Sequence, residues 1–116
     1  MKTIITSTGN DTKSQFDLRF GRAPYFCLID DNNLDEIEFH NNYFPYSNNK
    51  AGVSAAEKAL NLKVGKIISG EFGHQAKEVL DNNNVQIVMI NNENCTVAEI
   101  IDRLKNNENL SKLISN

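Results

Sequence analysis

The sequence of 116 residues contains no tryptophan, two prolines and two cysteines. Cys27 and Cys95 lie far apart and belong to no Cys-x-x-Cys pair, so the sequence indicates neither a disulfide framework nor a structural zinc site. Apolar runs long enough to span a membrane are also missing, and the N-terminus lacks the apolar stretch of a secretory signal. We therefore expect a cytoplasmic protein that has no contact with membranes.

An excess of positive charge is absent as well. Twelve Lys and Arg residues stand against 15 Asp and Glu residues, which gives a formal net charge of −3. The basic residues are scattered, and Arg19 and Arg22 form the closest pair that suggests a function. Because nucleic-acid-binding domains usually concentrate positive charge on one face, we expect no nucleic-acid partner.

The composition that remains is that of a folded globular protein, with 40% hydrophobic and 23% charged residues. The length predicts a single domain over residues 1–116. In the first half, apolar and β-branched runs predict strands at Thr3–Ser7 and Tyr25–Ile29, and alternation predicts a third strand that ends near Tyr43. The turn-forming residues Asp30–Asn33 join the second and third strands as a hairpin.

In the second half, helical and extended patterns alternate. The apolar periodicity predicts a helix over Val53–Leu60, a strand at Val64–Ser69, a helix including Ala76–Leu80 and a strand at Val85–Ile90. A capping box at Thr96–Glu99, followed by helical apolar spacing, predicts a last helix from Val97 to Leu104. Leu110, Leu113 and Ile114 allow one more helical turn.

This order of elements predicts an α/β protein with three layers, α/β/α, around a mixed five-stranded sheet. Ligands of such sheets collect at the carboxyl ends of the parallel strands. The loops after Ser7, Ser69 and Ile90 are therefore the places where we expect a ligand.

Three segments of the sequence are familiar. Residues Phe16–Phe26, which read FDLRFGRAPYF, resemble the motif that opens the dinitrogenase iron–molybdenum cofactor-biosynthesis family. Ala51–Ala56 and Ser69–Ala76 look like its second and third landmarks, and their order and spacing match over nearly the whole chain. The resemblance implies a ribonuclease H-like motif and a protein that holds or carries iron–sulfur or iron–molybdenum cluster precursors without performing a reaction. Arg19 stands where nitrogenase-associated members commonly have histidine, so a permanent cation replaces a metal ligand.

Two segments supply the candidate site residues. Arginine guanidinium groups match anionic clusters, phosphates or carboxylates, although such residues are also common on ordinary surfaces. Glycines at a turn into a helix allow close approach of an anion to the helix amides, although ordinary turns use glycine too. The predicted ligand-binding residues are Arg19, Phe20, Gly21 and Arg22 in the first segment, and Gly70, Phe72, Gly73 and His74 in the second. His74 is the candidate metal ligand among them.

The leading hypothesis is a non-enzymatic domain that binds or carries an anionic metallocluster, of iron–sulfur or iron–molybdenum type, together with a protein partner in cofactor assembly. An alternative is an interaction or regulatory domain that binds no metal. A third reading, a metal-dependent nuclease, requires several carboxylates around two metal ions. It is disfavoured because Lys2–Ser7 contains no acid and Asp17 has no evident partner.

Overall fold

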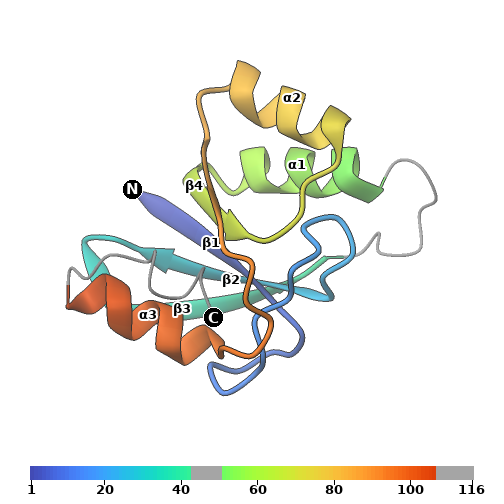
Figure 1. Ribbon diagram of the computed structural model, residues 1–116. Helices are drawn as coiled ribbons and strands as arrows, with labels where there is room; N and C mark the ends of the chain where they lie inside the picture. The colour runs from blue at the N-terminus through green and yellow to red at the C-terminus, as the bar shows by residue number, and fades with distance from the viewer. Residues whose placement is uncertain (43–50, 107–116) are drawn as a thin grey trace.

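The computed structural model describes residues 1–42 and 51–106, and its elements form three layers, with the sheet between helices on either side (Figure 1). Strands and helices alternate as predicted, in the order β1 (Lys2–Ser7), β2 (Tyr25–Asp30), β3 (Asn33–Asn41), α1 (Ala51–Asn61), β4 (Val64–Ser69), α2 (His74–Asn82), β5 (Gln86–Met89) and α3 (Val97–Lys105). The helical turn expected around Leu110–Ile114 and the predicted strand end at Tyr43 lie outside the described residues.

The five strands form one mixed sheet with the order β3-β2-β1-β4-β5. Strands β1, β2 and β3 are antiparallel neighbours, whereas β4 is parallel to β1 and β5 is parallel to β4. The predicted α/β/α architecture with a mixed five-stranded sheet is therefore confirmed. Helices α1 and α2 lead into β4 and β5, so both run in the same direction and begin at the carboxyl end of β1 and β4.

Each face of the sheet has its own hydrophobic core. Side chains alternate between the two faces along a strand, so Ile4 of β1 packs under α1 and α2 while Ile5 packs under α3. The side chains of β2 alternate in the same way: Phe26 and Leu28 face α1 and α2, and Cys27 faces α3. Helices cover both faces, which explains why the run Tyr25–Ile29 in β2 is continuously apolar in sequence.

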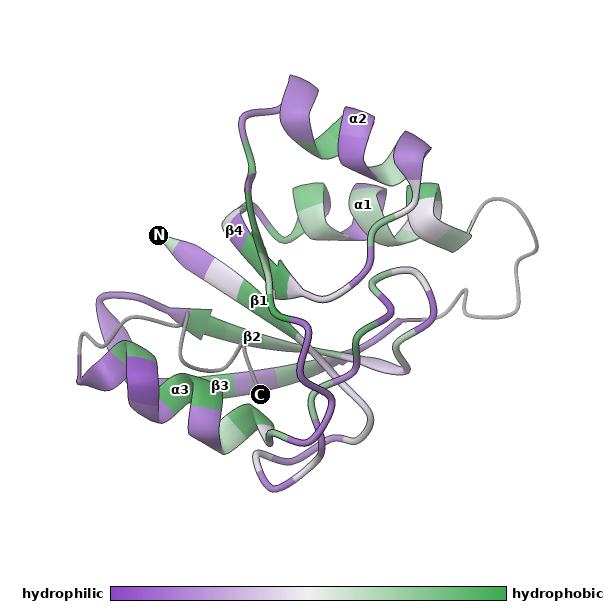
Figure 2. Cartoon of the chain, viewed as in Figure 1, coloured by the Kyte–Doolittle hydropathy of each residue, from purple (hydrophilic) through white to green (hydrophobic). Residues whose placement is uncertain are grey.

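The helices approach the sheet by two different means. Helix α1 buries only alanines, and Gly52 comes so near to α2 that a Cβ there would lie 3.2 Å from the Cβ of Ala76. Helix α3 is amphipathic, with a hydrophobic side toward the sheet and a hydrophilic side away from it (Figure 2). Its start is fixed by the predicted capping box, in which Thr96 accepts a hydrogen bond from the Glu99 amide. None of the described helices is both long and apolar enough to cross a membrane.

Candidate anion-binding groove

The loop between β1 and β2 folds back onto the turn that follows β4. Arg19 and Glu71 form a parallel β-bridge, the Phe20 amide donates to the Glu71 carbonyl at 3.0 Å, and the Gly70 amide donates to the Leu18 carbonyl at 3.0 Å. The structure thereby brings together the two segments that the sequence singles out, although they are about fifty residues apart.

Two hydroxyl groups fix this loop to the ends of the central strands. The Thr6 hydroxyl donates to the Asp17 carbonyl at 2.6 Å and lies 2.7 Å from the Ser69 hydroxyl, and both side chains are fully buried. Buried hydroxyl groups without partners would be costly, so the loop is held where it can satisfy them. This explains why buried polar residues follow the isoleucine pairs at the ends of β1 and β4.

Arg19 is held by a nearly inaccessible carboxylate. Asp17 is only 4% exposed, and its two oxygens accept hydrogen bonds from Nε of Arg19 at 3.1 Å and from Nη2 at 3.0 Å. These hydrogen bonds, followed by the Asp17 charge, raise the pKa of Arg19 above its ordinary value. The sequence did not single out this pair, because Arg19 is two residues away and its side chain reaches Asp17 only in this loop conformation.

The aromatic candidates have unequal positions. Phe20 is fully buried and belongs to the core under α1 and α2, where its ring lies 5.6 Å from that of Phe26 and 5.0 Å from that of Phe72. Phe72 is half-buried. Phe20 is therefore mainly a core residue, whereas Phe72 lies between the core and the surface.

The glycines also differ. A Cβ at Gly21 would lie 2.9 Å from both Cα and N of Gly52, so the first two sequence landmarks meet backbone to backbone. A Cβ at Gly70 would lie 2.6 Å from Leu18 Cδ2. At Gly73 a Cβ would meet nothing within 4 Å, so this glycine leaves open space at the start of α2.

Beside these contacts lies a groove with a cavity volume of about 410 Å³. The groove, which we call the Arg–Gly groove, is lined by the loop, the start of α1 and the turn after β4, through Arg19, Phe20, Gly21, Arg22, Ala51, Gly52, Glu71, Phe72 and Gly73. An adjoining hollow shares Gly52 and Gly73 with it and extends along the first turns of both helices to His74. The predicted site residues thus line the groove and the adjoining hollow, except Gly70, which packs behind them against Leu18.

The helix beginnings give the groove a positive character. Gly73 is the N-cap of α2 and supplies no side-chain hydrogen bond to the first-turn amides. N–H groups at a helix N-terminus carry partial positive charge and bind anions. His74 begins this helix, and its side chain is 93% exposed, with Nε2 3.8 Å from a Glu78 carboxylate oxygen. The imidazole is therefore at the outer rim.

A second cavity, of about 490 Å³, lies on the other side of Arg19. Its charged lining residues are mostly acidic, Asp17, Glu71 and Glu93, and Arg19 and Glu71 line both cavities. Sequence reasoning missed Glu71 and Asp17 as parts of the site. The available signal was their place beside the predicted residues, in Asp-x-Arg and in Gly-Glu-Phe-Gly.

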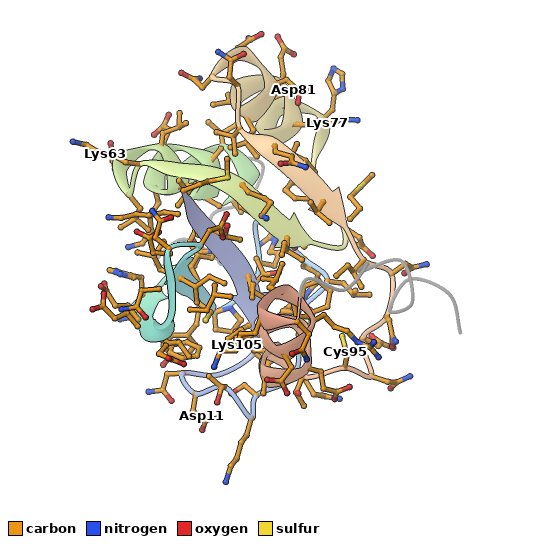
Figure 3. All side chains as sticks on the ribbon, turned by 90° about the vertical axis from the view of Figure 1, so that its left-hand side faces the viewer. Asp11, Lys63, Lys77, Asp81, Cys95 and Lys105 are labelled. Carbon is orange, nitrogen blue, oxygen red and sulfur yellow. The ribbon has the colours of Figure 1, made fainter. Side chains whose placement is uncertain are left out.

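The two thiols lie in the core on the α3 side of the sheet. Cys27 is fully buried, and burial raises its pKa to about 12. Cys95, labelled in Figure 3 near the start of α3, is also buried, and its Sγ donates to the Asn92 carbonyl at 3.1 Å. Burial raises the pKa of Cys95 too, so the helix dipole does not activate this thiol. Across residues 1–42 and 51–106, no group of three or more His, Cys, Asp or Glu side chains is placed to hold a metal ion.

A model of the dinitrogenase iron-molybdenum cofactor family matches residues 1–107. The chain belongs to the dinitrogenase iron-molybdenum cofactor family. The match covers both segments of the Arg–Gly groove, and it agrees with the three landmarks in the sequence. The family name associates the chain with the iron–molybdenum cofactor of dinitrogenase.

Solved structures of other proteins share the fold of this chain. The apo form of the orange protein from Desulfovibrio gigas is 23% identical, with a TM-score of 0.82 over 92% of this chain and 88% of that one. The NMR structure of a Thermotoga protein described as a candidate NifB protein is 26% identical, with a TM-score of 0.74 over 95% and 93% of the two chains. No functionally curated protein matches the chain significantly.

Proposed function

We propose that this member of the dinitrogenase iron-molybdenum cofactor family is a non-enzymatic cytoplasmic carrier that holds an anionic metallocluster, or a precursor of one, in the Arg–Gly groove. Its cargo would be of iron–sulfur or iron–molybdenum type, and it would pass to a protein partner in cofactor assembly. The family supports the class of cargo, and the groove supports the mode of binding. The cluster is a guest that is retained and released unchanged.

One observation carries the proposal. Arg19 and Arg22 line the same groove as the first residues of α1 and the N-cap of α2. Guanidinium groups and helix amides both favour polyatomic anions, and guanidinium groups in particular are weakly hydrated donors with a planar arrangement. Two kinds of donor with the same preference therefore surround one cavity.

His74 supplies the other mode of contact. It is exposed at the rim of the adjoining hollow, so its imidazole can reach a metal atom of a guest that extends beyond the arginines. In this proposal the arginines and amides retain the guest, and His74 is an additional ligand that orients it.

An anaerobic titration with tetrathiomolybdate, a sulfide-rich molybdenum dianion, tests the proposal by the change in its absorbance. We expect saturable binding of one equivalent. Arg22→Ala should weaken it about tenfold, because one charge-assisted hydrogen bond contributes roughly 1.4 kcal/mol or more. His74→Ala should weaken it less and should change the spectrum of the bound anion.

The matched control is Arg103→Ala, which removes the same charge from α3 on the opposite layer of the molecule. It should leave the dissociation constant within about twofold of the original value. Absence of saturable binding, or equal weakening by the two arginine variants, would contradict the proposed function.

The alternative of an interaction or regulatory domain that binds no metal has one observation in its favour. Phe20 lies in the core and Gly21 packs against the backbone of Gly52, so part of the family motif has a structural role. This alternative predicts that the unaltered protein does not bind tetrathiomolybdate and that Arg22→Ala lowers the free energy of unfolding. Circular dichroism during urea denaturation measures the second effect.

A further inference from the structure

Arg19 lies between two carboxylates that differ in exposure. Asp17 is buried beneath it and accepts two hydrogen bonds from its side chain and one from its backbone amide. Glu71 is exposed and lies across the β-bridge from Arg19. Of the five N–H donors of a guanidinium group, Asp17 therefore engages two, and the others remain on the side away from it.

The backbone of Glu71 is fixed, although its side chain is in solvent. Its carbonyl accepts the Phe20 amide at 3.0 Å, and the preceding Gly70 amide donates to Leu18. Residues paired across a bridge direct their side chains to the same side of the ribbon. The Glu71 side chain therefore leaves the backbone on the same side as that of Arg19, and Glu71 lines both the Arg–Gly groove and the acidic cavity.

Glu71 interacts with Arg19 by charge. The Glu71 carboxylate contributes to raising the pKa of Arg19, less than the Asp17 hydrogen bonds and the Asp17 charge do. An anion that enters the groove therefore meets Arg19, whose charge is already balanced by Asp17 beneath it. It also meets the negative charge of Glu71 on the same side. Like charges in one cavity oppose each other through a medium that screens them less than bulk water.

We propose that Glu71 limits the affinity of the Arg–Gly groove, by competing with the anionic guest for Arg19. This inference rests on the proposed function and adds to it a reason why the guest can be released. A carrier needs a complex that forms and then dissociates toward a partner, and a carboxylate held next to the binding cation weakens the complex without occupying the groove.

Glu71→Gln is the direct test, since the amide keeps the size of the side chain and removes its charge. Tetrathiomolybdate should bind to this variant about five- to tenfold more tightly than to the original protein, and most of the change should be in the dissociation rate, measured by stopped-flow displacement. The gain should shrink as the salt concentration rises.

Glu93→Gln is the matched control. Glu93 is also exposed, but it lines only the acidic cavity and not the Arg–Gly groove. The same loss of charge there should change the affinity by less than about twofold. Equal gains in the two variants would show a general effect of net charge and would overturn the role of Glu71.

A double-mutant cycle tests whether Glu71 acts through Arg19. In an Arg19→Ala background, Glu71→Gln should tighten binding clearly less than in the original protein, because only the direct repulsion between Glu71 and the guest is then removed. If the original protein binds tetrathiomolybdate and Glu71→Gln binds it equally, this inference fails and the proposed function stands. If neither binds it, both fail together.

Discussion

The Asp17–Arg19 pair shows how one buried charge organises the site. A carboxylate that is 4% exposed requires partners, and it obtains them from a guanidinium group that remains 57% exposed. Because Asp17 fixes this group by Nε and Nη2, a lysine at position 19 would not reproduce the same orientation.

Replacing Asp17 should therefore destabilise the fold. Asp17→Ala removes an acceptor of three hydrogen bonds from Arg19, so we expect the free energy of unfolding in urea to fall by about 1–3 kcal/mol. Glu93 lines the same acidic cavity as Asp17 but is exposed, so Glu93→Ala should change the free energy of unfolding by less than about 0.5 kcal/mol. Equal effects of the two substitutions would refute the structural role of Asp17.

The buried thiol of Cys27 predicts a dependence of stability on pH. Its pKa is raised from 9.0 to about 12 by burial, so the native state keeps the proton after the unfolded state has lost it. The stability is thus complete below pH 9.0 and is lost as the pH rises toward 12. This thiol should lower the free energy of unfolding by about 1.4 kcal/mol between about pH 8 and pH 10.

Urea denaturation at the two pH values measures that loss. Cys27→Ala should remove this part of the pH dependence, at the expense of a lower stability at both pH values. If the free energy of unfolding of Cys27→Ala depended on pH as steeply as that of the original protein, Cys27 would not be protected from ionisation in the native state.

At the scale of elements, the contact between the β1–β2 loop and α1 leaves no room for added volume. A methyl group at Gly21 would lie 2.9 Å from backbone atoms of Gly52, whereas at Gly73 it would meet nothing within 4 Å. We expect Gly21→Ala to cost about 1–3 kcal/mol of stability, because backbone must move to admit it.

Gly73→Ala is the comparison within the same groove. Alanine at this N-cap position should cost less than about 1 kcal/mol, and thermal denaturation of both variants measures the difference. A Gly21→Ala protein as stable as Gly73→Ala would mean that the two landmarks are not in the close contact described.

The elements themselves were largely predictable from sequence, and the reason is physical. Strand β2 is buried on both faces and carries a continuous apolar run, and α3 carries both a capping box and an apolar stripe, so local patterns identify these elements. The predicted ends differ from the observed ends by one or two residues. At β5, for example, the predicted end residues Val85 and Ile90 are buried but lie just outside the strand.

The site was predictable only in part. Motif resemblance pointed to Arg19–Arg22 and to the turn after β4, which line the groove together with Ala51 and Gly52, and the rule for parallel strands pointed to their carboxyl ends. The Asp17–Arg19 pair depends on the conformation of the β1–β2 loop, and the position of Glu71 beside it depends on how this loop folds onto a turn about fifty residues later. No local periodicity contains such a contact, so the one sequence signal for Asp17 and Glu71 was their place beside the predicted residues.

At the scale of the whole molecule, the central strands join the two cores. Strand β1 contributes to both, through Ile4 on one face and Ile5 on the other, and it pairs with β2 and with β4. Neither core can therefore be lost without disturbing the other, and we expect the chain to unfold as one domain.

Urea denaturation followed by two probes tests this expectation. Far-UV circular dichroism reports the helices, and accessibility of Cys27 to a thiol reagent reports the core on the α3 side. Both should change at the same urea concentration. Separate midpoints would show two independently folding parts.

The walls of the Arg–Gly groove come from three stretches that are distant in the chain, at Arg19–Arg22, Ala51–Gly52 and Glu71–Gly73. A guest that contacts all three stretches binds only the folded state, in which they lie together, and it therefore stabilises that state against unfolding. Filled molecules would then resist proteolysis better than empty ones. Under the proposed function, ordinary protein turnover would then remove molecules without cargo, with no dedicated sensor.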